Sequence, residues 1–168
     1  MTSPTTHRVR RISGVISTDD IIPARYKHMH TDPDLLAPHL FEAYRPGFAA
    51  TLQPGDALVS DTIFGIGSSR EQAVSTLLAN GVGAVFAPSF GRILFRNCWN
   101  LALPAIELDT DLLVEGSEIT LDLAAGQVRT AGQVLTTFPP PSAFLLDMST
   151  GGGLLRQIAR SLETGVES

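Results

Sequence analysis

The sequence has very little cysteine: among its 168 residues, only Cys98 carries a thiol. A single cysteine excludes an intrachain disulfide, which is typical of proteins in a reducing compartment. One thiolate is also too few to hold a zinc ion or an iron–sulfur cluster, so we expect no metal site in this chain. Four apolar residues lie near Cys98 in the sequence, at Ile93, Leu94, Phe95 and Leu101, which predicts a buried structural thiol.

Long apolar runs are lacking as well. Met1–Arg11 has no apolar core of the kind that a signal peptide needs, and no later run is long enough to span a bilayer. The formal net charge of −5 argues against nonspecific binding to nucleic acid and to anionic membranes. The sequence therefore predicts a soluble cytoplasmic protein with neither a nucleic-acid nor a membrane partner.

The composition is that of a globular protein, with 43% apolar and 17% charged residues. The length is typical of one domain, so we expect a single domain over residues 1–168. The first seven residues are polar, which predicts a disordered terminus at residues 1–7.

Hydrophobic periodicity predicts a mixed α/β fold with a β-rich later part. Residues 17–20 are interpreted as a polar turn, and the helix predicted over residues 33–44 contains Pro38, which forces a kink. Hairpins are predicted between residues 118 and 138. The remaining expected elements are strands at 8–16, 56–60, 83–87 and 103–108 and helices at 71–79, 91–100 and 154–162.

The glycine-rich segment at residues 64–73, FGIGSSREQA, is the most informative in the chain. It contains a strand, a glycine loop and a helix start in that order. Ser68 and Glu71 have the spacing of a helix capping box, and the free N–H groups of a helix start attract anions. Arg70 adds a planar double donor suited to a carboxylate. The pattern alone favours an ordinary helix cap over a catalytic site.

A family resemblance changes this balance. FGIGSSREQA resembles the FGxGSSREHA signature of the aconitase superfamily, and STDDIIPARY (17–26), PSFGR (88–92) and RNCWNLALP (96–104) resemble further motifs in the same order. The overall likeness, over about residues 8–162, is to the short, archaeal-type small subunits of 3-isopropylmalate dehydratase. The resemblance implies a single swivelling β/β/α three-layer domain of the aconitase C-terminal type.

The resemblance also implies roles for individual residues. Ser68 corresponds to the catalytic base, Ser69 and Arg70 to binders of substrate carboxylates, and Asp19 to an active-site aspartate. A serine is a poor base unless its anion is stabilised, which a helix N-terminus and an adjacent arginine can do. The implied reaction is elimination and re-addition of water on a hydroxy di- or tricarboxylate.

The departing hydroxyl group needs a Lewis acid, which in this family is an iron of a [4Fe–4S] cluster. Because this chain has one cysteine, the resemblance places the cluster on a separate large subunit, without which the small subunit is inactive. The expected substrates are 2- and 3-isopropylmalate, in leucine biosynthesis. Homoaconitate, citraconate or citramalate, and dimethylmalate are alternatives, and a non-catalytic anion-binding module is an alternative of another class.

The loop after Pro23 is where short members of this family select their substrates. Here Arg25, Lys27 and His28 are the expected substrate-binding residues, and the loop is more polar than an isopropyl group favours. His28 and His30 could in principle bind a metal, but we expect them to face solvent or substrate. Gln72 replaces the histidine that is usual in the family, so we expect it to support the site without acid–base chemistry.

Overall fold

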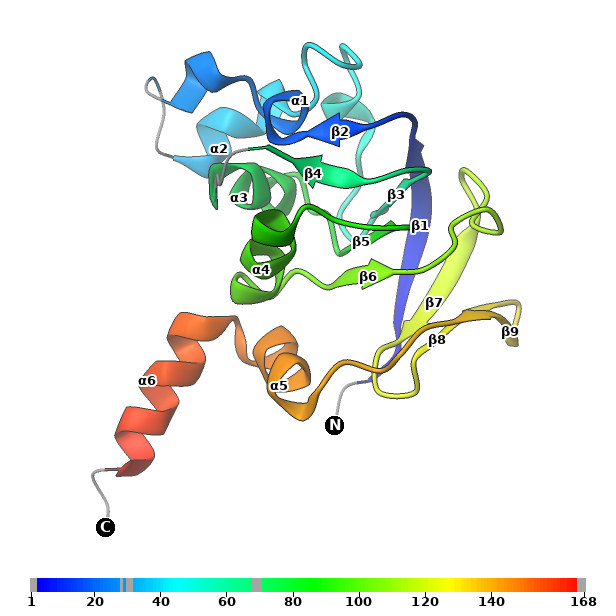
Figure 1. The fold of residues 1–168 in the computed structure, drawn as a ribbon, viewed down its shortest axis with the longest axis vertical. Helices are drawn as coiled ribbons and strands as arrows, with labels where there is room; N and C mark the ends of the chain where they lie inside the picture. The colour runs from blue at the N-terminus through cyan, green and yellow to red at the C-terminus, as the bar shows by residue number, and fades with distance from the viewer. Residues whose placement is uncertain (1–2, 28, 30–31, 68–70, 166–168) are drawn as a thin grey trace.

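The protein, described here from a computed structural model that covers residues 3–27, 29, 32–67 and 71–165, is built on a seven-stranded mixed sheet (Figure 1). The strand order is β6-β5-β3-β1-β7-β8-β9. The strands are β1 (Thr5–Ile12), β3 (Ala57–Ser60), β5 (Ala84–Ala87), β6 (Ala105–Glu107), β7 (Glu118–Asp122), β8 (Gln127–Thr130) and β9 (Gln133–Thr137). The first four named are mutually parallel, and β7, β8 and β9 continue the sheet as the predicted antiparallel hairpins.

Strand β1 joins the two halves of this sheet. Its first half pairs with β7 in antiparallel fashion, from Thr5 opposite Leu121 to Arg8 opposite Glu118. Its second half, Val9–Ile12, pairs in parallel with β3. The expectation that residues 1–7 are disordered is therefore wrong for Thr5–His7. Their backbone is ordered by a partner strand more than a hundred residues away, which local polarity cannot indicate.

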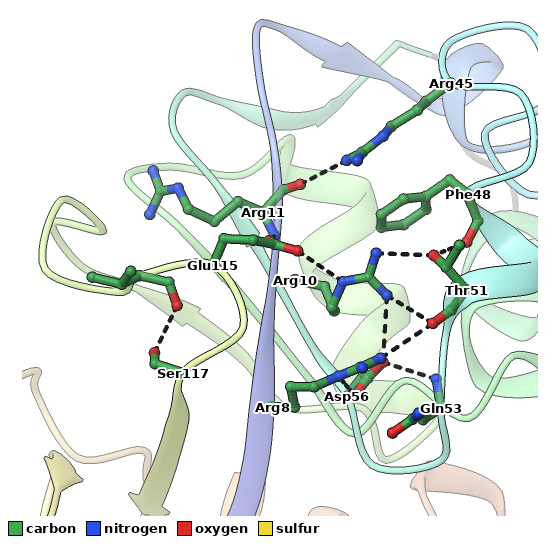
Figure 2. Close-up of polar contacts among 11 residues, drawn as sticks. Arg8, Arg10, Arg11, Arg45, Phe48, Thr51, Gln53, Asp56, Glu115 and Ser117 are labelled. Atoms are coloured by element: carbon green, nitrogen blue, oxygen red, sulfur yellow. Dashed lines mark hydrogen bonds and ion pairs between the residues drawn. The ribbon is translucent and has the colours of Figure 1, made fainter.

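Charged side chains of β1 bind the two segments beside it (Figure 2). Arg8 donates from Nε to Oδ1 of Asp56 at 3.0 Å and from Nη2 to Oδ2 at 2.6 Å. Arg10 donates from Nε to Glu115 Oε1 at 3.0 Å and from Nη1 to the Thr51 carbonyl oxygen at 2.8 Å. The backbone N–H of Gln53 also donates to Asp56. These contacts hold the residues just before β3 and the turn before β7 against β1.

Two helices of the parallel half were predicted from periodicity and are observed. Helix α3 (Glu71–Ala79) buries Ala73, Val74 and Leu77, and helix α4 (Arg92–Asn100) buries Leu94, Cys98 and Trp99. Each presents one apolar face to the core, as the helical spacing requires. Among the described residues, no helix is long and apolar enough to cross a membrane.

The helix expected over residues 33–44 is instead broken. Helix α2 covers only Pro33–Leu36, and a 3-10 turn, η2, follows at Ala37–His39. Asp32 caps α2 by accepting a hydrogen bond from the Asp34 N–H at 2.9 Å. The α-helical pattern stops where Pro38, which has no N–H and clashes with the preceding turn, would have to continue it.

The C-terminal part contains a helix that periodicity missed. Helix α5 (Ala143–Gly151) is capped by Ser142, and its apolar residues run consecutively without helical spacing. Glycines 151–153 separate it from α6 (Leu154–Gly165), which runs three residues beyond the predicted end. Figure 1 shows α6 projecting from the body of the molecule beyond α5, with the C-terminus at its far end.

Candidate active site

A short second sheet brings two of the sequence motifs together. Strand β2 (Ile16–Ser17) pairs in parallel with β4 (Phe64–Ile66), so that Ser17 lies opposite Ile66. Both strands lead into their motifs at the same end of this sheet (Figure 1). A β-carbon on Gly67 would lie 3.3 Å from Thr18 Oγ1. The STDD segment and the glycine loop, some fifty residues apart in sequence, are therefore neighbours in space.

A third motif closes on the same loop. Phe90 of the PSFGR segment forms a parallel bridge with Phe64. The Phe64 N–H donates to the Ser89 carbonyl oxygen at 3.0 Å, and the Phe64 carbonyl oxygen accepts from the Gly91 N–H at 2.9 Å. A β-carbon on Gly65, which has a φ of +84°, would collide with Leu94 of α4. Gly65 thus has to be a glycine both for its backbone conformation and for this close packing.

Residues 17–21 form a short helix and not the polar turn that the sequence predicted. Helix α1 (Thr18–Ile21) starts with a capping box, in which the Asp20 N–H donates to Ser17 Oγ at 3.1 Å and the Ser17 N–H donates to Asp20 Oδ2 at 2.8 Å. The capping box assigns one of the two adjacent aspartates to structure. Asp19, in contrast, is exposed.

The predicted catalytic serine is not among the residues that the structure describes. Ser68, Ser69 and Arg70 lie outside the described residues, which resume at Glu71, the first residue of α3. The predicted capping box between Ser68 and Glu71 is therefore also outside the description. The structure describes the residues on either side of this segment: β4 ends at Ile66, Gly67 lies beside Thr18, and α3 begins at Glu71.

The predicted substrate loop begins at a 3-10 turn, η1 (Ala24–Lys27). The side chain of Lys27, and His28 and His30 entirely, lie outside the described residues. Arg25 is described, and its Nη2 donates to Tyr26 Oη at 3.1 Å and to Glu42 Oε2 at 3.2 Å. The Tyr26 hydroxyl and the nearby Glu42 carboxylate raise the pKa of the Arg25 guanidinium.

Sequence reasoning missed the partners of Arg25. Glu42 accepts a hydrogen bond from Tyr26 Oη at 2.6 Å and lies 3.3 Å from Nδ1 of His39, whose ring stacks on Tyr26. The hydrogen bond from Tyr26, with His39 and Arg25 adding to it, lowers the pKa of Glu42. The i, i+3 spacing of His39 and Glu42 within the predicted helix was the available signal.

No group of three or more His, Cys, Asp or Glu side chains that could hold a metal ion occurs among the described residues. Cys98 is fully buried, as predicted, and burial raises the pKa of its thiol to about 12. A protonated thiol within an apolar core is not suited to ligate iron, which binds thiolate. The described part of the chain therefore does not fit an iron–sulfur cluster of its own.

Comparison with known proteins agrees with this geometry. The family model of the aconitase C-terminal domain matches residues 24–111. The chain is 46% identical over 145 residues to the 3-isopropylmalate dehydratase small subunit of Deinococcus deserti, covering 83% of this chain and 78% of that protein. It is 40% identical over 163 residues to the methanogen homoaconitase small subunit of Methanothermobacter thermautotrophicus, covering 95% and 93%. The crystal structure of 3-isopropylmalate dehydratase from Methanocaldococcus jannaschii superposes with a TM-score of 0.88 at 31% identity, covering 99% of this chain and all of that one.

Proposed function

Because the chain belongs to the aconitase family, in the group of hydro-lyase small subunits that carry its C-terminal domain, we propose that it completes the active site of a two-subunit hydro-lyase. The reaction we propose is the interconversion of 2- and 3-isopropylmalate by dehydration and rehydration, in leucine biosynthesis. One observation above all supports this proposal: the STDD, FGIGSSRE and PSFGR segments, distant in sequence, meet at the β2–β4 sheet.

In this proposal, Ser68 is the base that removes the proton next to a substrate carboxylate. Proton removal there places additional negative charge on that carboxylate, so donors around it lower the barrier. Ser69, Arg70 and the free N–H groups at the start of α3 would supply those donors. Asp19 is the second acidic or basic group that we assign to the site, because it directly follows Thr18, the first residue of α1, which lies beside Gly67.

A large subunit would supply the remaining half of the site. The elimination needs a Lewis acid for the departing hydroxyl group, and we propose that a [4Fe–4S] cluster on that large subunit provides it. The buried, protonated Cys98 supports a cluster outside this chain. The small subunit should accordingly have no hydro-lyase activity by itself.

The loop that begins with η1 would bind the variable part of the substrate, through Arg25, Lys27 and His28. A second candidate substrate is homoaconitate, because the homoaconitase relative matches 95% of this chain and these side chains favour an extra carboxylate. The hydrated form of homoaconitate differs from 3-isopropylmalate in one group, which is a carboxylate arm in place of the isopropyl group. A single cationic side chain in the loop would therefore suffice to discriminate between them.

The test is reconstitution of the chain with its cognate large subunit under anaerobic conditions. Dehydration of 3-isopropylmalate would be followed by the rise in ultraviolet absorbance of the unsaturated acid, and hydration of homoaconitate by the fall in its absorbance. We expect activity on 3-isopropylmalate, no activity with either subunit alone, and loss of turnover in Ser68→Ala with normal complex formation. Ser75→Ala is the matched control, because Ser75 is a half-buried serine within α3, and this variant should keep full activity. Near-normal turnover by Ser68→Ala would contradict the assignment of the base, and activity on homoaconitate alone would replace the substrate.

A further inference from the structure

Four side chains on either side of the substrate loop form one connected group, which we call the Glu42 cluster: Arg25, Tyr26, His39 and Glu42. Glu42 is its centre, because its Oε2 accepts hydrogen bonds from both Tyr26 and Arg25 and its Oε1 faces His39. The Tyr26 ring is stacked on His39 at a centroid distance of 4.0 Å and lies 4.7 Å from the Arg25 guanidinium carbon. One carboxylate thus holds three aromatic or cationic groups in place.

The cluster joins the two ends of the loop. Arg25 and Tyr26 precede the segment 27–31, and His39 and Glu42 follow it, so that the contacts of Glu42 close the chain across the loop. The cap from Asp32 to Asp34 fixes the point where the chain leaves the loop. Both ends of the segment are therefore held by side-chain contacts, whatever group the loop itself binds.

The cluster is also tied to the elements that carry the catalytic motifs. The Phe41 N–H donates to the Ile21 carbonyl oxygen at 2.9 Å, at the end of α1. Asn80, directly after α3, donates from Nδ2 to the Ala37 carbonyl oxygen at 3.0 Å. Asp19 lies in α1, and the segment that contains Ser68 precedes α3. A displacement of the cluster would therefore move the loop relative to α1 and α3.

The orientation of the Arg25 guanidinium is set by the same contacts. Both of its hydrogen bonds to described residues use Nη2, and neither uses Nε or Nη1. The guanidinium is planar, so fixing one nitrogen against Glu42 orients the other two. Glu42 therefore partly offsets the positive charge of Arg25, and the N–H groups on Nε and Nη1 can still donate to a substrate.

We propose that Glu42 is the positioning residue of substrate recognition: it orients Arg25 and fixes the ends of the substrate loop, and so determines how tightly and how selectively the variable arm of the substrate is bound. The proposal rests on the proposed hydro-lyase function. It assigns to Glu42 no part in the chemical step. Its loss should therefore raise KM and change selectivity while kcat stays close to that of the wild type.

The experiment compares the reconstituted wild-type complex with complexes that contain Glu42→Gln, Tyr26→Phe and the control Glu118→Gln. Glu118 is an exposed glutamate at the start of β7, so its substitution removes the same charge elsewhere. For Glu42→Gln we expect KM for the preferred substrate to rise roughly tenfold, with kcat within about twofold. Tyr26→Phe should shift KM in the same direction by less, and Glu118→Gln should change neither constant.

A double-substitution cycle separates positioning from a general loss of structure. If Glu42 acts through Arg25, the KM effects of Glu42→Gln and Arg25→Gln should not add, because each removes the same contact. An unchanged KM in Glu42→Gln and Tyr26→Phe, or fully additive effects with Arg25→Gln, would overturn the proposal while the hydro-lyase function stands. If Glu42→Gln fails to fold, Tyr26→Phe and the Arg25→Gln cycle with it decide the question. Inactivity of the wild-type complex on every hydroxy acid would overturn the proposed function, and this inference with it.

Discussion

Gly91 lies directly against the carbonyl group of Gly65. A β-carbon at position 91 would come within 2.8 Å of the Gly65 carbonyl carbon and still closer to its oxygen. This contact, between residues of two different motifs, is what allows α4 to start beside the glycine loop. The obstacle is backbone, which cannot move aside as the tip of a flexible side chain can.

Substitution of Gly91 by alanine should therefore separate the two motifs. We expect Gly91→Ala to lower the free energy of unfolding by about 1–3 kcal/mol or more, as overpacking does, and to reduce hydro-lyase activity of the reconstituted complex. Gly165→Ala is the control, because a β-carbon there meets nothing within 4 Å. Urea denaturation of the isolated chain measures the stability of both variants. A stable, fully active Gly91→Ala variant would show that the contact is not required.

The adjacent aspartates of α1 should differ in the consequences of their loss. Asp20→Asn weakens the capping box with Ser17 and should cost about 1 kcal/mol of stability, with activity largely kept. Asp19→Asn should cost less stability than Asp20→Asn and should reduce kcat, because we assign Asp19 to the reaction. Thermal denaturation and turnover, measured on both variants, test this contrast. The reverse pattern would move the catalytic assignment from Asp19 to Asp20.

Asp56 should be the most sensitive carboxylate of the sheet. Its side chain is 3% exposed and accepts two hydrogen bonds from Arg8. Asp56→Asn removes the counter-charge of Arg8, whereas Arg10 keeps its ion pair with Glu115. Because Arg8 is itself partly exposed, we expect a loss of about 2–3 kcal/mol, measured by urea denaturation. Glu118→Gln, an exposed carboxylate of β7, should change stability by less than about 0.5 kcal/mol.

The same substitution has a defined pH dependence. Burial alone would raise the pKa of Asp56, but the hydrogen bonds from Arg8 and the Gln53 N–H, together with the charges of Arg8 and Arg10, lower it overall. A carboxyl group with a lowered folded-state pKa contributes stability above its unfolded pKa and loses it as the pH falls through the folded one. The difference between wild type and Asp56→Asn should be constant near neutral pH and shrink below about pH 4. A difference that grew on acidification would contradict this.

Cys98 should be inert toward thiol reagents in the folded protein. Burial raises its pKa to about 12, so almost no thiolate is present at neutral pH, and no path to the side chain is open. We expect alkylation at pH 8 to be slower by orders of magnitude than in urea, with the rate followed by mass spectrometry. Equal labelling rates in the two conditions would mean that α4 opens readily.

Much of the local structure could be predicted from the sequence. The spacing of Ala73, Val74 and Leu77 predicted α3, and alternation in residues 118–138 predicted the hairpins, because both patterns are set by neighbours in the chain. Helix α5 was missed because its apolar residues lack that spacing, and α1 because its four residues are too few for a period. A kink at Pro38 was expected, but the α-helix instead ends at Leu36, before this proline.

The sequence by itself determined most of the elements, the glycine loop with its resemblance to the aconitase family, and a thiol count too low for an iron–sulfur cluster. Only the tertiary structure decided which distant residues meet: Gly65 with Gly91, Arg8 with Asp56, and Arg25 with Glu42. The reason is physical. Periodicity reports the face that an element buries, whereas contacts between elements depend on strand order and register, which arise when the whole chain packs.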